Sequence, residues 1–413
     1  VLEHEGSTVC DASTEAITTG IAYEREARRR TTRSAPVQVP KDLDLAKALL
    51  AVVGSHNVAS REHVFSHYDS EVKGNTLVRP GEADASVVEP IDGSPAGVAV
   101  AADGNSFLGA LDPYTAGAAA VAEAIRNVAA VGAVPVALTD CLNFGNPEVP
   151  EVFHDFVESV RGIGDAARGI GMKDSDEPVP IVSGNVSFYN QSSNGSAVLP
   201  TPVVCCVGYL ADAAAHLTMG LKAAGNALYL LGQRHGELGA SEFARTFLGA
   251  RGSDVPRVRF DEERSACAAV TDLAEERLAE SCHDISEGGL VAALAEMMLA
   301  GAPDSAPGIK VTWDALQPEA GQNGAARERA AGPDERARTA RLLFCENGGY
   351  VLEVRPENED RVREIAERRG AWCAKIGETT EAPSLVLAGL SLTTSRESLE
   401  RAWTGGARGV MAL

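Results

Sequence analysis

The chain of 413 residues is 45% hydrophobic and carries a formal net charge of −21. This length exceeds what one ordinary hydrophobic core supports, so we expect two domains. The negative charge argues against nucleic acid as a partner, because contacts to phosphates depend on Lys and Arg. The sequence holds no run of about 18 apolar residues and therefore predicts no membrane-spanning helix and no membrane partner.

The charged residues and the cysteines indicate the cellular compartment of the protein. Arginine supplies most of the positive charge and lysine is scarce, which fits either a salt-rich cytoplasm or a high-GC genome, and both explanations stay open. The eight cysteines include no C-x-x-C pair, so we expect free thiols in a reducing compartment. We therefore expect a cytoplasmic protein.

The first 40 residues predict a tail with few strands. The basic stretch at residues 25–33 is followed by prolines, a pattern typical of an extended, solvated linker. The chain begins at Val1 without an initiator Met or a signal segment, so we expect a fragment or one piece of a longer polypeptide. A helix is then expected to begin at Asp42 or Asp44.

The next 170 residues alternate between strand and helix patterns. The expected strands are residues 85–88, 97–101, 134–138, 179–182 and 203–210. The expected helices are residues 115–131 and 151–170, each with apolar residues spaced for one helical face.

The pattern changes after residue 210, and a second α+β domain is expected beyond a joint near residues 211–220. Its expected strands are residues 226–231, 342–344, 350–354 and 372–376, the last of them the final strand. Its expected helices are residues 241–248, 261–279 and 357–368, together with one that follows a loop at residues 283–289 and ends near residue 299. Residues 315–338 lack periodicity and predict a surface insertion.

Two polar segments carry the strongest functional signal. Thr139–Pro147 and Ser183–Asn190 are dense in Gly, Asn, Asp and Ser, and each directly follows a β-branched run. Loops of this kind at strand ends can surround phosphate and a divalent metal with backbone N–H groups and short oxygen ligands. The alternative is that these residues only make turns, since the same residue types populate any loop.

Weaker candidates lie elsewhere in the chain. Asp103, followed by Gly104, is a second metal candidate or an ordinary Asp-Gly turn. The segment His283, Asp284, Ser286 and Gly288 precedes a helix whose N-terminus suits a phosphate or simply carries an N-cap.

For three residues on the helix at 115–131, we expect only a solvated or domain-facing surface. They are Glu123, Arg126 and Asn127.

Six segments carry a family resemblance: residues 75–85, 111–114, 139–147, 183–190, 199–202 and 283–290. In this order they resemble the PurL-type formylglycinamidine ribonucleotide synthases of the AIR-synthetase-like ATP-binding group. The resemblance covers the chain from about residue 22 to residue 380. It implies an α+β fold: an ATP-binding domain with a mixed sheet and helices at 41–215, then a C-terminal α+β domain at 216–413.

Members of this family contain two tandem copies of this domain pair, and the chain resembles the second copy. Residues 1–40 would then be the end of a preceding domain plus a linker. The family's catalytic histidine lies in the first copy, so the resemblance assigns no catalytic base here. Cys345–Gly349 departs from the family pattern, which favours a degenerate second cleft.

The resemblance implies a ligase reaction of purine biosynthesis. ATP, formylglycinamide ribonucleotide and glutamine-derived ammonia would give formylglycinamidine ribonucleotide, ADP and phosphate. It implies that Asp140 and Gly184 contact ATP, Asn185 binds Mg²⁺ and Ser187 binds the substrate. These residue types suit the roles, because an amide oxygen is a hard magnesium ligand and glycine lets the backbone approach phosphate.

The implied partners are the first half of the synthase, a glutaminase subunit of the PurQ type and a small bridging subunit of the PurS type. Two alternatives stay open. The chain could be a non-catalytic half that holds a nucleotide as a structural ligand. It could also be a free-standing enzyme similar to AIR synthetase, although its loops resemble PurL more closely.

Overall fold

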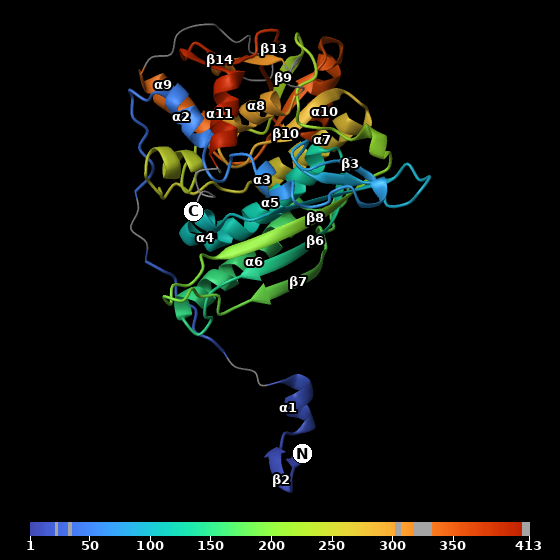
Figure 1. Cartoon of the computed structure of the whole chain (residues 1–413), viewed down its shortest axis with the longest axis vertical. Helices are drawn as coiled ribbons and strands as arrows, with labels where there is room; N and C mark the ends of the chain where they lie inside the picture. The colour runs from blue at the N-terminus through green and yellow to red at the C-terminus, as the bar shows by residue number, and fades with distance from the viewer. Residues whose placement is uncertain (21–23, 32–34, 302–306, 317–332, 407–413) are drawn as a thin grey trace.

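The computed structural model describes residues 1–20, 24–31, 35–301, 307–316 and 333–406. Two sheets, each covered by helices, lie one above the other, and the first twenty residues extend away from both (Figure 1). Among the described residues, no helix combines the length and apolar character that crossing a bilayer requires.

The first sheet is mixed. In the described part of the chain it contains six strands in the order β3-β4-β5-β8-β6-β7, antiparallel except for the parallel pair β6 and β7. The strands are β3 (Thr76–Val78), β4 (Ser86–Val88), β5 (Gly97–Asp103), β6 (Val134–Asn143), β7 (Ile181–Ser187) and β8 (Thr201–Leu210).

Two long helices, α5 (Pro113–Ala130) and α6 (Pro150–Ile170), accompany this sheet, and α4 (Ser106–Leu111) precedes them. Asp112 caps α5 by accepting a hydrogen bond from Thr115 N at 2.8 Å. The helices approach closely at Gly117 and Gly162, where any Cβ would collide with a backbone carbonyl of the other helix.

The second sheet contains, within the described residues, seven strands in the order β10-β12-β9-β13-β11-β14-β15. They are β9 (Ala227–Leu231), β10 (Ala279–Asp284), β11 (Gly308–Thr312), β12 (Tyr350–Val354), β13 (Cys373–Thr380), β14 (Ser384–Ala388) and β15 (Leu392–Ser395). Its helices are α7 (Phe260–Glu275), α8 (Gly289–Ala300), α9 (Pro333–Phe344), α10 (Glu359–Arg369) and α11 (Arg396–Gly405).

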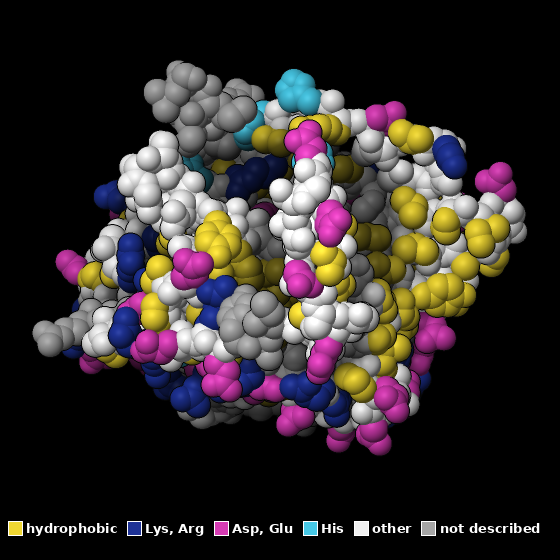
Figure 2. Space-filling view, turned by 90° about the horizontal axis from the view of Figure 1, so that it is seen from below, with side chains coloured by type: hydrophobic (Ala, Val, Ile, Leu, Met, Phe, Trp, Pro, Cys, Tyr) yellow, Lys and Arg dark blue, Asp and Glu magenta, His cyan; other side chains and the backbone are white. Residues whose placement is uncertain are grey.

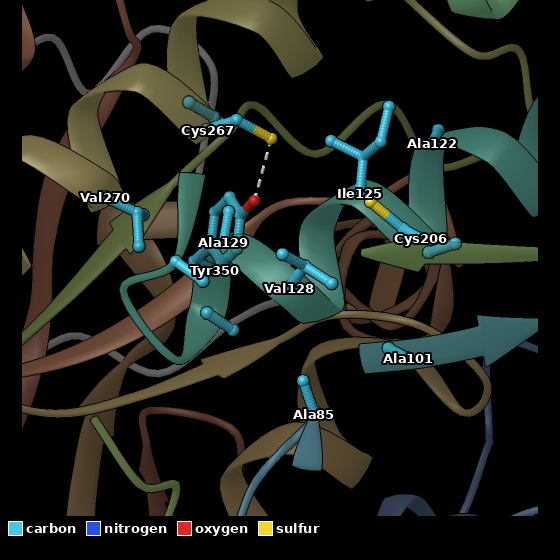
Figure 3. Packing of buried hydrophobic residues seen from close by; sticks show 14 of the residues in the cluster. Ala85, Ala101, Ala122, Ile125, Val128, Ala129, Cys206, Cys267, Val270 and Tyr350 are labelled. Atoms are coloured by element: carbon cyan, nitrogen blue, oxygen red, sulfur yellow. Dashed lines mark hydrogen bonds between the residues drawn. The ribbon is translucent and has the colours of Figure 1, made fainter. Parts of the chain in front are cut away.

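The hydrophobic core runs without a break from one sheet to the other. Helices α5 and α7 face each other, and their buried residues form one cluster with side chains of both sheets. Figure 3 shows this contact, where Val128 of α5 lies near Tyr350, and the hydroxyl of Tyr350 lies 3.0 Å from the sulfur of Cys267. The two domains therefore share buried surface.

Helix α2 (Leu45–Val53) begins after Asp44, as predicted, but it belongs to the other core. Its buried leucines lie in a cluster with α8, α9 and one face of the second sheet. The expectation that residues 41–215 form one domain is wrong for this helix. Its apolar face gave no information about which sheet it would cover.

Both polar segments were predicted as loops, and this is wrong for their first halves. Strand β6 continues through Asn143, and β7 continues through Ser187. Because β6 is hydrogen-bonded to β8 on one side and β7 on the other, the ladder overrides the turn preference of its polar residues.

Further differences concern the ends and short runs. The tail contains a hairpin, β1 (Leu2–His4) and β2 (Ser7–Cys10), and helix α1 (Thr14–Thr19). Residues 342–344 end helix α9 rather than forming the expected strand, because a run of three apolar residues cannot distinguish a helix from a strand.

Strands β14 and β15 follow the strand that was expected to be the last. His283 and Asp284 lie in strand β10 rather than in the expected loop. Most of the predicted insertion, residues 317–332, lies outside the described residues.

Candidate functional site

The neighbouring strands β6 and β7 bring the residues of the two polar segments together. In their parallel register, Asp140 lies opposite Gly184, Cys141 opposite Asn185, and Asn143 opposite Ser187. The segments are about 40 residues apart in the sequence yet adjacent in the sheet.

Because side chains alternate along a strand, these residues divide between the two faces of the sheet. Asp140 lies on the same face as Leu138 and Leu142, whose side chains are buried. Asn185 and Ser187 lie on the opposite face, where Asn185 is exposed and Ser187 is half-buried. A ligand that contacts both sets must therefore lie around the edge formed by β7.

The structure gives a local reason for glycine at position 184. A Cβ there would lie 2.6 Å from both carboxylate oxygens of Asp140, so no other residue fits without moving that side chain. Partial burial raises the pKa of Asp140 above its usual value. The half-buried carboxyl group of Asp140 therefore lies directly beside the backbone of Gly184, which has no side chain.

A second group of candidates lies between the two domains. Asp103 at the end of β5, Glu123 on α5 and Glu287 before α8 place carboxylate oxygens within 4.8 Å of one another. Asn105 Nδ2 donates to Glu287 Oε1 at 2.9 Å. We refer to Asp103, Glu123 and Glu287 as the interdomain carboxylates.

Burial and mutual repulsion make these carboxyls hold protons tightly. The pKa of Asp103 is raised to about 8, chiefly by burial and then by the charge of Glu287. Burial also raises the pKa of Glu123 well above its usual value, and that of Glu287 above its usual value. Three such groups either share protons or hold a cation, and oxygen ligands of this kind suit Mg²⁺.

The predicted segment before α8 lies next to this cluster. The Oδ1 of Asp84 lies 2.6 Å from Nδ1 of His283, and the Oδ2 of Asp84 accepts from Asp284 N at 3.2 Å. Burial opposes charge on His283, but Asp84 and Glu296 outweigh it and raise its pKa well above the usual value. Asp84, His283 and Asp284 form a second group with the ligand types of a metal site.

The segment before α8 was expected either to suit a phosphate or to carry an ordinary N-cap, and the N–H of the capping residue Gly288 already has an internal partner. Gly288 N donates to Glu346 Oε1 at 2.7 Å, and Ser286 Oγ lies 3.4 Å from Asp284 Oδ1. Gly288 adopts φ 85°, which favours glycine at this position. Glu346 belongs to the segment that departs from the family pattern.

Arg126 connects both groups. Its guanidinium is buried and lies 3.0 Å from Glu263, 3.4 Å from Asp284 and 3.4 Å from Glu123. The sequence predicted a solvated or domain-facing surface for Glu123, and the domain-facing alternative is confirmed, but no ligand role was predicted for it. Glu287 and Asp84 were missed, although both lie inside segments that carry the family resemblance. Their partners come from the other domain, which no local pattern shows.

Two family models match the chain. The N-terminal domain of AIR synthase related proteins matches residues 82–210, and the C-terminal domain matches residues 223–389. The chain belongs to the AIR-synthase-related family. Its sequence relatives within this family include PurL proteins. Phosphoribosylformylglycinamidine synthase subunit PurL of Methanothrix thermoacetophila is 42% identical over 100% of this chain and 51% of its own length.

Solved structures of this family share the fold. The chain aligns with Thermotoga maritima PurL complexed with FGAR at a TM-score of 0.64 and 20% identity, covering 87% of this chain and 53% of that one. The ATP complex of that protein and the PurLQS structure from the same organism align with TM-scores of 0.60 and 0.61, at 20% and 19% identity. Each alignment covers 87% of this chain and 52% of the other. The chain spans about half the length of the curated relatives it matches.

Proposed function

We propose that this chain is one half of a synthase that converts formylglycinamide ribonucleotide to formylglycinamidine ribonucleotide with ATP and glutamine-derived ammonia. The observation that carries the proposal is the register of β6 and β7. It brings all four residues that the family resemblance implicates to one end of a strand pair. The sequence relatives are PurL subunits, which fits this assignment.

We assign the roles by side-chain chemistry. Asp140 and the backbone at Gly184 would contact ATP, Asn185 would bind Mg²⁺ through its amide oxygen, and Ser187 would hold the ribonucleotide. Bound magnesium would offset the charge of the triphosphate. The residues of this chain would hold the triphosphate beside the substrate amide, so that the amide oxygen takes the γ-phosphoryl group and ADP leaves. Ammonia would then bond to the amide carbon, lose a proton and displace phosphate, which gives the amidine.

The catalytic base would come from a partner domain, and the first sheet offers a surface for one. Strand β7 is exposed on both faces, with Val182 68% exposed, and Val100 and Tyr209 project from the face opposite the helices. Viewed from the end of the molecule that carries β6, β7 and β8, apolar side chains form a broad band (Figure 2). An apolar surface of this kind is typical of a protein interface.

The N-terminal residues support the assignment to a second copy. Strands β1 and β2 and helix α1, capped by Ser13, repeat the order of β14, β15 and α11, capped by Ser395. The apolar residues of the first unit are exposed, for example Ile17 at 73%. We therefore propose that residues 1–40 end a preceding domain of the same type and then form a linker.

We also propose a glutaminase subunit of the PurQ type and a bridging subunit of the PurS type as partners. The structure named PurLQS, to which the chain is similar in fold, supports this expectation. Ammonia supply by another subunit would agree with the burial of most cysteines among the described residues.

The magnesium role can be tested through one side chain. In the assembly of this chain with the first half and ammonia, Asn185→Ala should raise the Mg²⁺ concentration needed for half-maximal turnover about tenfold. Asn194→Ala, in the exposed loop after β7, serves as the control and should leave it unchanged. An unaltered magnesium dependence in the Asn185 variant would remove this role.

A second function is favoured by the interdomain carboxylates. Their repulsion would be relieved by a divalent cation, with or without a nucleotide, held as a structural ligand. We expect Mg²⁺ to raise the melting temperature of the isolated chain, and Glu123→Gln to reduce that increase. Equal stabilisation of both proteins by Mg²⁺ would argue against the site.

A further inference from the structure

The ends of β6 and β7 are joined by one side chain. The amide Nδ2 of Asn190 donates to the carbonyl oxygen of Phe144 at 3.1 Å and to that of Ser187 at 2.9 Å. The same nitrogen lies 3.0 Å from Ser187 Oγ, and Ser187 Oγ donates to Asn190 Oδ1 at 3.2 Å. Asn190 therefore connects both polar segments.

These contacts fix the orientation of the amide. Two carbonyl oxygens face Nδ2, so a rotated amide would place oxygen against oxygen and lose both hydrogen bonds. The amide oxygen therefore stays beside the hydroxyl of Ser187. That hydroxyl has one partner that accepts its proton and another that donates to its lone pair.

The segment around Asn190 packs against helix α6 and contains a turn with a strained backbone. The rings of Phe144 and Phe188 lie 6.5 Å apart and both contact Phe156 of α6, at 5.5 Å and 4.9 Å between centroids. Tyr189 adopts φ 60°, a left-handed conformation that is unfavourable for a residue with a side chain. Anchored rings and a strained turn are typical of a segment whose geometry is set for binding.

We propose that Asn190 is a positioning residue that directs the Ser187 hydroxyl toward the anionic group of the ribonucleotide. This inference rests on the proposed function. When a phosphate oxygen approaches, the hydroxyl proton turns from Asn190 Oδ1 to the ligand, while Nδ2 shares one of its two protons between a carbonyl oxygen and Ser187 Oγ. A hydroxyl that accepts a hydrogen bond is a stronger donor, so the contact to the ligand is strengthened.

The test is a double-substitution cycle in the assembled synthase. Asn190→Asp keeps the shape of the side chain but places a carboxylate against two carbonyls and the anionic ligand. Asn190→Ala removes the contacts without adding charge and covers the case in which the first variant fails to fold. Each should raise KM for the ribonucleotide roughly tenfold, the effect of about 1.4 kcal/mol, with kcat and KM for ATP little changed.

The cycle distinguishes positioning from general support. If Asn190 acts through Ser187, then Asn190→Ala should add less than about twofold to KM in a Ser187→Ala background. Asn194→Asp is the matched control, because the Oδ1 of Asn194 accepts from Ser196 N at 2.9 Å and a carboxylate keeps that bond. It should leave KM unchanged.

Three results would overturn the inference. In the first result, the increases in KM caused by Asn190→Ala and Ser187→Ala multiply in the double variant. In the second, the loss is confined to kcat. Either result would make Asn190 a structural residue only, and the proposed function would stand. A wild-type assembly that neither turns over nor binds the ribonucleotide by calorimetry would overturn the proposed function and this inference together.

Discussion

At the scale of single residues, the contact between Asp140 and Gly184 explains why two positions far apart in the sequence depend on each other. The glycine is needed because the carboxylate occupies the space of a Cβ, which is a steric condition between strands. From the sequence alone, Gly184 suggested only a close approach of phosphate. The structure adds a neighbour that the sequence could not reveal.

Gly184→Ala should therefore displace the Asp140 carboxylate. We expect a loss of about 1–3 kcal/mol in the free energy of unfolding and a higher KM for ATP, measured by chemical denaturation and steady-state kinetics. Gly164→Ala in α6 is the control, because its Cβ would meet only the flexible end of Arg168 and alanine favours a helix. A variant at Gly184 as stable and active as the wild type would contradict the contact.

The interdomain carboxylates and His283 predict how stability depends on pH. Raised pKa values mean that the folded chain binds protons that the unfolded chain releases between about pH 4 and pH 7. The free energy of unfolding should therefore fall as pH rises from about 5 through 8, where Asp103 titrates. Melting curves across this range measure the effect.

Two further measurements separate the carboxylates from the other groups. Glu123→Gln should flatten the decline, because it removes one repelling charge without changing the shape of the side chain. Mg²⁺ should oppose the decline if it binds there. Stability that rises steadily from pH 5 to pH 8 without metal would contradict these pKa shifts.

At the scale of elements, long periodic segments were predictable and their spatial partners were not. Helices α5 and α6 follow from apolar residues at helical spacing, and the strand before each polar segment follows from β-branched runs. The extension of β6 to Asn143 could not be predicted, because its polar residues favour turns and only the flanking strands hold them in the ladder.

The packing of helix α2 against the second sheet, rather than the first, can be tested by substitution. Leu49 is fully buried in the core of the second sheet, so Leu49→Ala should lower the free energy of unfolding by about 2–5 kcal/mol. The neighbouring Leu50 is only half-buried, and Leu50→Ala should cost less. Hydrogen exchange should then increase in β9 and β12 before β6. Faster exchange in the first sheet alone would contradict the assignment of α2.

At the scale of the whole molecule, the family resemblance supplied the two-domain plan, and the structure added how the domains join. Periodicity located helices α5 and α7 but gave no sign that they share one core with both sheets. The roles of the candidate residues on β6 and β7 came from the resemblance. Glu123 and Glu287 became candidates only from the structure, in which the loop before α8 of the second domain lies against α5 of the first. Contacts across a domain boundary leave no local trace in a sequence.

The shared core predicts that the two domains unfold together. Calorimetry of the chain should show one cooperative transition, because separating the domains would expose the buried faces of α5 and α7. Val270→Asp, a charge placed in this fully buried contact, should lower the melting temperature of that single transition. Two well-separated transitions in the wild-type chain would contradict a continuous core.

We propose above that this chain completes a synthase together with a preceding half. The most direct measurement is ATP-dependent formation of formylglycinamidine ribonucleotide from ammonia by each half alone and by the two combined. We expect product only from the combined halves, and a strong loss of product when Asp140→Ala or Asn185→Ala is present in this chain. Turnover by this chain alone, or no turnover by the properly associated pair, would contradict it.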